Sequence, residues 1–240
     1  MYKRQGDSTL RLTTPPESAD YIAMTLDTLK RFGITAEYKN FSRFHIPGRQ
    51  TYRPRTLSVE ADWSQAAFWY AAAGLGSEIT VEGMDPRSLQ GDRVFPHWGE
   101  LMGGEDPHAA SIDVSRSPDL VPPAAARGAC MNGTLYLNRA GRLRLKESDR
   151  LSAITEVLTA MGANVTGEAD RLIIEGTPTL RGGCTVDCRG DHRIAMMAAV
   201  AATRCAAPVT VTGAECVSKS YPRFWEDYVL LGGNIETSEV

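Results

Sequence analysis

The segment 142–150 holds the densest group of side chains able to do chemistry. Its nine residues include four cationic and two carboxylate side chains. An apolar stripe from Leu151 to Met161 follows, and its spacing predicts a helix with one buried face. Because free N–H groups and the helix dipole favour anions at a helix N-terminus, the segment could hold an anionic ligand. Taken alone, it also fits a solvated run of surface charge.

Two further predicted helix starts carry cations. Asp191 is a good N-cap, and His192 and Arg193 follow it. Lys219 directly precedes Ser220, which is expected to cap a third helix. Three helix N-termini that each carry a Lys or Arg, at corresponding places in a repeat, indicate one shared anion site. This convergence favours a site over a solvated surface.

The elements that must position these residues recur along the chain. Four helix-like segments run into a glycine about every 60–70 residues, at Gly33, Gly103, Gly162 and Gly232. Glycine there suits the left-handed position that closes many helices.

A second class of helix is rich in alanine and apolar on all sides, which predicts burial. These helices are expected at 64–74, 122–130 and 191–203. Short β-branched or alternating runs predict strands at 57–60, 79–82, 133–137, 171–175 and 209–212. One such βαβαββ-type unit cannot bury its own apolar helix, so several must pack together. The predicted fold class is α+β, with repeated units around buried helices.

Composition excludes several classes of protein. The formal net charge of −3 over 240 residues argues against a general nucleic-acid or membrane binder. No apolar run reaches the roughly 18–20 residues of a membrane span. The segment 1–7 lacks the apolar run of a secretory signal. We therefore expect a cytoplasmic protein with no nucleic-acid or membrane partner.

The five cysteines are odd in number and scattered through the chain. Cys184 and Cys188 could be read as metal ligands, but no second Cys or His pair has matching spacing. We expect reduced, buried thiols and no metal site.

Three of these segments resemble the signature of the 5-enolpyruvylshikimate-3-phosphate synthase family. They are the run 144–151, with its Lys-Glu-Ser-Asp-Arg-Leu core, the run 190–196, with Asp-His-Arg, and the run 219–222. The resemblance extends over nearly the whole chain, from Ser8 to Glu236, and the combination is highly specific.

The resemblance implies a fold and a domain organisation. Family members have the enolpyruvyl transferase fold, with two domains of three units and the substrates in the cleft between them. On this basis residues 1–60 are the last unit of one domain, residues 61–240 are most of the other, and the fold is truncated. Nothing in the chain matches the family's N-terminal lysine–serine pair or its arginine for phosphoenolpyruvate, so an N-terminal half is expected to be missing.

The resemblance also implies a reaction. The enolpyruvyl group of phosphoenolpyruvate passes to the 5-hydroxyl of shikimate 3-phosphate and phosphate is released, without a metal or organic cofactor. This step belongs to the shikimate pathway to chorismate and the aromatic amino acids.

Two carboxylates are implied to be catalytic. Asp119 stands at the family's general base, and is expected to contact and deprotonate the hydroxyl. It also fits a cap for the following alanine-rich helix. Glu147 is expected to assist proton transfer at the enol carbon. A hydroxyl that needs a base and a carbon that needs an acid suit paired carboxylates in a cationic site.

Substrate binding is implied for seven further residues. Lys146 is expected to hold shikimate 3-phosphate, and Ser18 and Tyr21 to touch its phosphate from the other domain. The carboxylate and phosphate of phosphoenolpyruvate are assigned to Arg150, Arg193 and Lys219, with His192 beside them. Arg142 stands where many members carry a polar amide, which puts that contact in doubt.

Two alternatives stay open. UDP-N-acetylglucosamine enolpyruvyl transferases share the fold and the donor, but that family lacks the combined signature. The chain could also be a non-catalytic remnant, or a subunit that requires an N-terminal partner chain. On that ground the chain by itself is expected to be inactive.

Overall fold

The computed structural model describes residues 6–16, 18–104 and 108–238. The chain divides into two compact units. Unit 1 comprises Met1–Ala61 and Asp85–Gly91, and unit 2 comprises Asp62–Met84 and Asp92–Val240.

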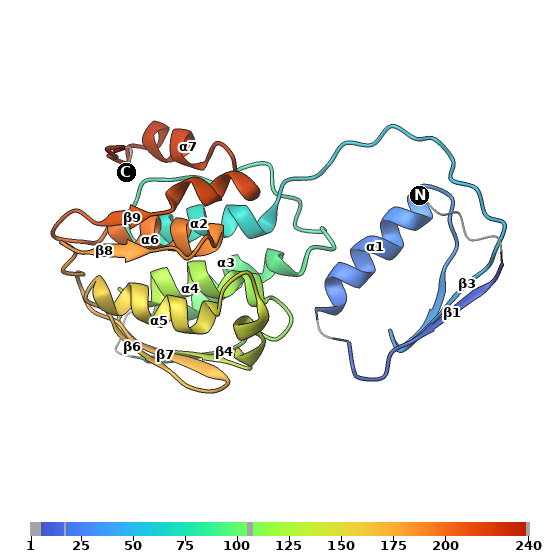
Figure 1. Ribbon diagram of the computed structural model, residues 1–240, viewed down its shortest axis with the longest axis horizontal. Coiled ribbons are helices and arrows are strands. Elements are labelled where there is room, and N and C mark those ends of the chain that lie inside the picture. Colours follow the sequence, from blue (N-terminus) through green and yellow to red (C-terminus); the bar gives the residue numbers. More distant parts are fainter. Residues whose placement is uncertain (1–5, 17, 105–107, 239–240) are drawn as a thin grey trace. The chain divides into compact units, whose positions relative to one another are not determined.

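Unit 1 pairs one helix with a small sheet (Figure 1). The strands β1 (Ser8–Arg11), β3 (Arg43–Ile46) and β2 (Glu37–Lys39) lie in that order, all antiparallel. The helix α1 (Ala19–Arg31) has no fully buried residue. Ile34 and Phe44 are the apolar side chains buried in the described part of this unit. One helix over three short strands therefore encloses little core.

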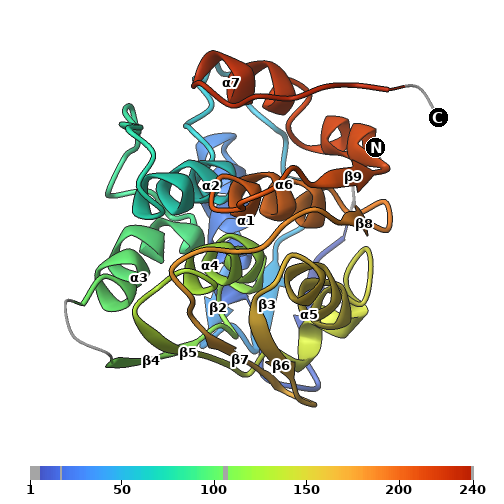
Figure 2. The same cartoon turned by 90° about the vertical axis from the view of Figure 1, so that its left-hand side faces the viewer.

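Unit 2 is organised around three alanine-rich helices. The helices α2 (Trp63–Gly74), α4 (Val121–Gly128) and α6 (His192–Ala202) pack against one another in the middle of the unit (Figure 2). Every residue from Ile194 to Ala201 is buried. Because small alanine side chains let the helix backbones approach closely, these helices bury apolar surface on all sides. The prediction of a buried helical centre is confirmed.

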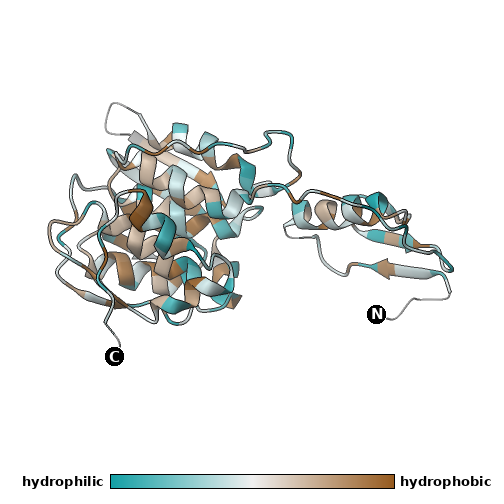
Figure 3. Ribbon diagram, turned by 90° about the horizontal axis from the view of Figure 1, so that it is seen from above, coloured by the Kyte–Doolittle hydropathy of each residue, from teal (hydrophilic) through white to brown (hydrophobic). Residues whose placement is uncertain are grey.

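Sheets and helices with a solvent-exposed face surround this centre. A four-stranded sheet has the order β4 (His108–Asp113), β5 (Gly133–Asn138), β7 (Arg171–Glu175) and β6 (Asn164–Gly167), with β4 and β5 parallel and the other pairs antiparallel. A second sheet pairs β8 (Thr185–Asp187) with β9 (Thr210–Thr212) in parallel. The remaining helices are α3 (Phe95–Met102), α5 (Arg150–Ala160) and α7 (Phe224–Leu230). Viewed from above, hydrophobic and hydrophilic residues alternate along the helices of the unit (Figure 3).

Four short 3-10 segments complete the described structure. They are η1 (Gly91–Val94), η2 (Pro118–Leu120), η3 (Gly141–Leu145) and η4 (Ala214–Lys219). Three of them, η2, η3 and η4, carry or directly precede residues with predicted chemical roles. Among the described residues, no helix is both long and apolar enough to cross a membrane.

Two predicted strands are wrong. Residues 57–60 and 79–82 have no strand structure, because no described segment offers them a ladder of backbone hydrogen bonds. Ile79 and Val81 instead lay partly buried side chains against the core, whereas Val59 is 97% exposed. At 79–82 the apolar alternation thus correctly indicated side chains that pack against the core, but it did not indicate a strand that pairs with another strand.

Helix ends differ from expectation at two places. Gly33, Gly162 and Gly232 have positive φ angles of 79°, 102° and 96°, as predicted for left-handed caps. Gly103 does not, with φ −99°. At the other end, α7 begins at Phe224 and not near Ser220.

Candidate functional site

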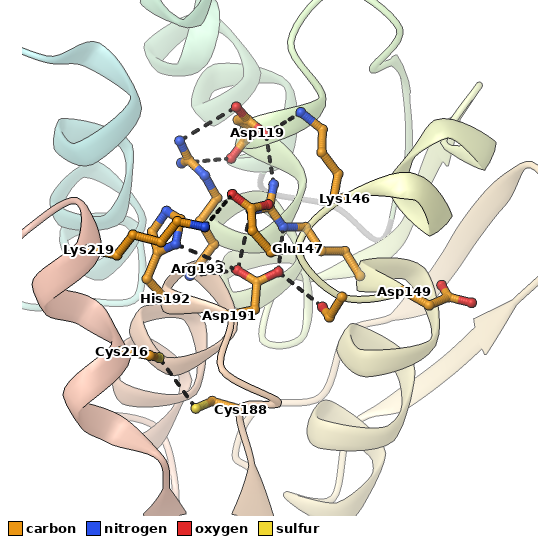
Figure 4. Close-up of polar contacts among 12 residues, drawn as sticks. Asp119, Lys146, Glu147, Asp149, Cys188, Asp191, His192, Arg193, Cys216 and Lys219 are labelled. Carbon is orange, nitrogen blue, oxygen red and sulfur yellow. Dashed lines mark hydrogen bonds and ion pairs between the residues drawn. The ribbon is translucent and has the colours of Figure 1, made fainter.

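Arg150 is the centre of the predicted site. It is the first residue of α5 and is only 1% exposed. Its Nε donates to Asp191 Oδ2 at 2.7 Å, and its Nη1 donates to Asp119 Oδ1 at 2.8 Å. Its Nη2 donates to Glu147 Oε2 at 2.5 Å and to Asp191 Oδ1 at 3.2 Å. One buried guanidinium therefore holds three carboxylates that come from three different segments (Figure 4).

Asp191 fixes the inner side of this arrangement. It is fully buried, and as the N-cap of α6 it accepts the Arg193 N–H at 3.0 Å. It also accepts a hydrogen bond from Ser148 Oγ at 3.0 Å. Burial acts to raise the pKa of Asp191, but the hydrogen bond and charge of Arg150 outweigh it, and the pKa is lowered. Asp191 is thus a carboxylate anion whose acceptor sites are taken by Arg150, Ser148 and the helix start.

Asp119 lies on the outer side, among three cations. Its carboxylate is 3.0 Å from Lys146 Nζ, 2.8 Å from Arg150 Nη1 and 3.6 Å from Arg193 Nη2. Burial acts to raise its pKa, but the charges of Arg193, Lys146 and Arg150 lower it to about 2. Asp119 lies in η2 and caps no helix with its side chain, so its alternative role as a helix cap is wrong.

Glu147 links the buried centre to a more exposed cation. Its Oε2 accepts from Arg150, and its Oε1 is 3.3 Å from Lys219 Nζ. Burial acts to raise the pKa of Glu147, yet a backbone hydrogen bond and Arg150 lower it below its ordinary value. The side chains of Glu147 and Lys219 are 31% and 56% exposed, so this edge of the site meets solvent.

His192 contributes a buried, neutral ring. It is 4% exposed, and its Nδ1 has no hydrogen-bond partner in the described structure. Asp191 Oδ1 lies 4.0 Å from that atom, beyond hydrogen-bond distance. Burial and then the charge of Arg193 lower the pKa of His192. The ring is therefore neutral at neutral pH and keeps an unsatisfied polar atom beside the cations.

The structure brings together seven of the nine predicted site residues. Those that meet, together with Asp191, form the group that we call the Arg150 cluster: Asp119, Lys146, Glu147, Arg150, Asp191, His192, Arg193 and Lys219. Four permanent cations face three carboxylates in this cluster, so it carries a positive excess. Its outer cations and a buried guanidinium suit the binding of phosphate and carboxylate groups.

Ser18 and Tyr21 lie in unit 1, at the start of α1. Ser18 is the residue before the helix and adopts a left-handed backbone, with φ 52° and ψ 47°. Tyr21 is 39% exposed. Arg142 lies in η3 of unit 2.

Three cation-bearing runs were expected to lie at helix N-termini, and the structure places two of them there. Arg150 follows the cap Asp149 of α5, whose side chain accepts from the Ser152 N–H. Arg193 follows the cap Asp191. Lys219, however, ends η4, because the chain turns once more before α7 begins. Lys219 therefore presents its side-chain charge without the support of a helix dipole.

Sequence reasoning missed the part of Asp191 in the cluster. It identified Asp191 as a helix cap, which is correct, but not as the carboxylate that orients Arg150. The available signal was a carboxylate directly before His192 and Arg193. In the described part of the chain, no group of three or more His, Cys, Asp or Glu side chains is arranged to hold a metal ion.

Comparison with known proteins gives consistent matches. The sequence model of the family described as EPSP synthase (3-phosphoshikimate 1-carboxyvinyltransferase) matches residues 3–228. A 3-phosphoshikimate 1-carboxyvinyltransferase of Clostridium kluyveri is 44% identical over 96% of the chain and 57% of the relative. That of Clostridium acetobutylicum is 44% identical over 96% of the chain and 56% of the relative.

Solved structures agree on the fold. The EPSP synthase of Acinetobacter baumannii aligns with a TM-score of 0.79 and 25% identity, over 98% of this chain and 59% of that one. The enolpyruvyl transferase NikO of Streptomyces tendae aligns with a TM-score of 0.69 and 20% identity, over 97% and 57%. The described fold is thus the enolpyruvyl transferase fold. The chain spans a little over half the length of the relatives that it matches.

Proposed function

From the chain's membership of the EPSP synthase family we infer that it carries the acid–base and anion-binding half of an enolpyruvyl transfer site. The reaction moves the enolpyruvyl group of phosphoenolpyruvate to the 5-hydroxyl of shikimate 3-phosphate, and releases phosphate. The observation that carries this proposal is the pairing of Asp119 and Glu147 through Arg150, with Lys146 and Lys219 at the two outer edges.

The chemistry needs a base and an acid a short distance apart. The hydroxyl adds to C2 of the enolpyruvyl group while C3 gains a proton, and the tetrahedral intermediate then loses phosphate. Asp119 takes the hydroxyl proton, and Glu147 assists proton transfer at C3. Arg150 contacts both carboxylates, so it sets the distance between the two proton-transfer groups.

Asp119 needs a raised pKa to act as a base. With a pKa of about 2, it is a weak base while three cations surround it. Lys146 and Arg193 lie 3.0 Å and 3.6 Å from Asp119. Two bound anionic substrates would pair with these cations and offset their positive charge near Asp119. Substrate binding would therefore raise the pKa of Asp119 and switch on its basicity within the complex.

The cations divide into outer and inner ones. Lys146 binds shikimate 3-phosphate, and Arg193 and Lys219 bind the carboxylate and phosphate of phosphoenolpyruvate, next to His192. Arg150 is 1% exposed and its described partners are carboxylates, so it reaches a substrate only where Asp119 or Glu147 gives up a contact.

Two of the proposed binding residues belong to unit 1. Ser18 and Tyr21 touch the phosphate of shikimate 3-phosphate. We assign residues 1–60 to the last unit of one domain and 61–240 to most of the other, with the active site in the cytoplasm. Since the chain spans about 57% of its relatives, the contacts that complete the site come from sequence matching their remainder.

A second candidate function is a subunit or remnant that has no turnover without an N-terminal partner. Release of phosphate from phosphoenolpyruvate and shikimate 3-phosphate tests both. It is measured with the chain alone, with the chain plus a polypeptide matching the uncovered N-terminal portion of the relatives, and with Asp119→Asn in each case. Phosphate release that is lost in Asp119→Asn supports the enolpyruvyl transfer function. Phosphate release only with the N-terminal polypeptide supports a subunit, and none in any combination supports a non-catalytic remnant.

A further inference from the structure

Two cysteines lie next to the Arg150 cluster, below Asp191 in the view of Figure 4. Cys188 Sγ and Cys216 Sγ are 3.5 Å apart, and the Cys188 thiol also donates to the Gly213 carbonyl at 3.0 Å. Cys188 is fully buried, whereas Cys216 is partly exposed. The two thiols therefore touch, and Cys216 is the more exposed residue of the pair.

Each cysteine belongs to a segment that carries a residue of the cluster. Cys188 lies three residues before Asp191, and its carbonyl accepts the Asp191 N–H at 2.9 Å. Cys216 lies in η4, three residues before Lys219. The sulfur pair thus joins the loop that positions Asp191 to the segment that presents Lys219.

We propose that Cys188 and Cys216 are a modification site, a dithiol that an oxidant closes to a disulfide, and that closure weakens the binding of an anion by Lys219. The second part rests on the proposed function. A disulfide has an S–S length of about 2.05 Å, so the two sulfurs must approach by about 1.5 Å. Because Cys216 and Lys219 share one short 3-10 segment, that approach moves Lys219 relative to Glu147.

The reaction balances with a low-molecular-weight disulfide as the oxidant. The Cys216 thiol gives its proton to solvent, and the thiolate attacks one sulfur of the oxidant, which expels one thiolate. The Cys188 thiol then loses its proton, and its sulfur attacks Cys216 Sγ and expels the second thiolate. The two cysteines lose two electrons and two protons, and the oxidant leaves as two thiols.

The surroundings of Cys216 make this closure slow and dependent on pH. Burial, together with the neighbouring Cys188, Asp191 and Glu215, raises the pKa of Cys216 to about 12. The Cys216 thiol is thus protonated at neutral pH, and the rate of closure should rise with pH as its thiolate fraction grows.

Peptide mapping of the whole chain after treatment with oxidised glutathione tests the disulfide. Trypsin alone leaves Cys184 and Cys188 in one peptide, and Cys205 and Cys216 in another, so the linked cysteines could not be identified. Glutamyl endopeptidase is therefore added to cut after Asp187 and Glu215. We expect residues 188–189 linked to 216–219, two hydrogens lighter than the separate peptides.

Matched variants identify the pair. Cys188→Ser and Cys216→Ser should abolish the linked peptide, and the controls Cys184→Ser and Cys205→Ser should keep it. Absence of the linked peptide from a chain with unchanged circular dichroism, or its persistence in Cys188→Ser, would overturn the assignment.

Binding of inorganic phosphate by calorimetry tests the coupling. We expect about 2- to 5-fold weaker binding after oxidation, the effect of weakening one solvent-exposed ionic contact. The treated Cys188→Ser chain should bind as the untreated one does. Equal affinity of oxidised and reduced chains overturns the coupling. If the reduced chain binds neither phosphate nor phosphoenolpyruvate, both the proposed function and the coupling are overturned. The peptide map still tests disulfide formation in that case.

Discussion

Arg150 and Asp191 form a two-point ion pair in which both side chains are buried, at 1% and 0% exposure. They begin two different helices, α5 and α6, which are 41 residues apart at these positions. A buried pair of this kind stabilises the fold little beyond its desolvation cost, but the loss of one partner strands the other charge. The pair therefore ties the geometry of the site to the integrity of the core.

Asp191→Asn should lower the free energy of unfolding by about 3–5 kcal/mol, because it leaves the Arg150 guanidinium buried with less compensating charge. Urea unfolding followed by circular dichroism measures this. Asp149→Asn is the matched control, since Asp149 also caps a helix and accepts from an arginine but is 36% exposed. Its effect should stay near or below about 1 kcal/mol. Equal losses of unfolding free energy in the two variants would show that the buried pair contributes no more to stability than the exposed one.

Asp119 should give the protein an acid-sensitive contribution to stability. Its pKa falls from 3.8 to about 2 in the folded chain. A depressed carboxyl pKa contributes stability that is present above the unfolded pKa, and this is lost as the pH falls through the folded pKa. The contribution amounts to about 2 kcal/mol.

The measurement compares wild type with Asp119→Asn across this window. The difference in unfolding free energy should be full at pH 6, shrink below about pH 4, and vanish near pH 2. A difference that stays constant from pH 6 to pH 2 would contradict the assigned charge interactions.

Arg193→Gln should weaken the binding of phosphoenolpyruvate or inorganic phosphate by about tenfold, the typical effect of losing one charge-assisted hydrogen bond. Arg223→Gln is the control, because Arg223 is an exposed arginine of unit 2 that pairs with Glu226 and Asp227. It should leave the affinity unchanged. Calorimetry at two salt concentrations measures both, and higher salt should weaken binding to the partly exposed cluster. A phosphate affinity that does not depend on Arg193 would remove this residue from the proposed site.

The chain by itself should show little or no transferase activity. Holding both reactants at near-attack distance can supply roughly 7–11 kcal/mol of the barrier, and this requires groups from the remainder of the family's length. Addition of the matching N-terminal polypeptide should restore phosphate release. Efficient turnover by the chain alone, lost in Asp119→Asn, would refute the incomplete site and support the catalytic role of Asp119.

Most of the site could be predicted because its residues sit in short, specific runs. Lys146, Glu147 and Arg150 are close in sequence, and a helix start fixes their spacing in space. The link between Arg150 and Asp191 could not be predicted in this way, because it depends on how α5 docks against α6. Sequence periodicity reports the face that a helix buries, but not the partner of a polar group at its end.

In the fold, too, features set by the local sequence could be predicted, whereas features that depend on contacts between distant segments could not. The alanine-rich helices were predictable, since all-round apolar character admits no other placement. The segment 79–82 was not, because strand structure requires a pairing partner in addition to apolar alternation. The prediction of a helix start at residues 219–223 was also wrong, although Ser220 and Pro222 are good helix-start residues. Tyr221 lies between them, and its hydroxyl forms hydrogen bonds with Trp69 and Asp227. The chain turns after it, and α7 begins only at Phe224.

The burial of α6 on nearly every side has a consequence for how the protein tolerates sequence change. The helix cannot slide or rotate without repacking α2 and α4, so Asp191, His192 and Arg193 keep their positions when the outer elements vary. Substitutions at Leu230 of α7, which is 81% exposed, can therefore accumulate in evolution without disturbing the site, whereas Phe224 of the same helix is fully buried. A single enlargement at Ala195 or Ala198, both of which are fully buried, would shift all three residues together.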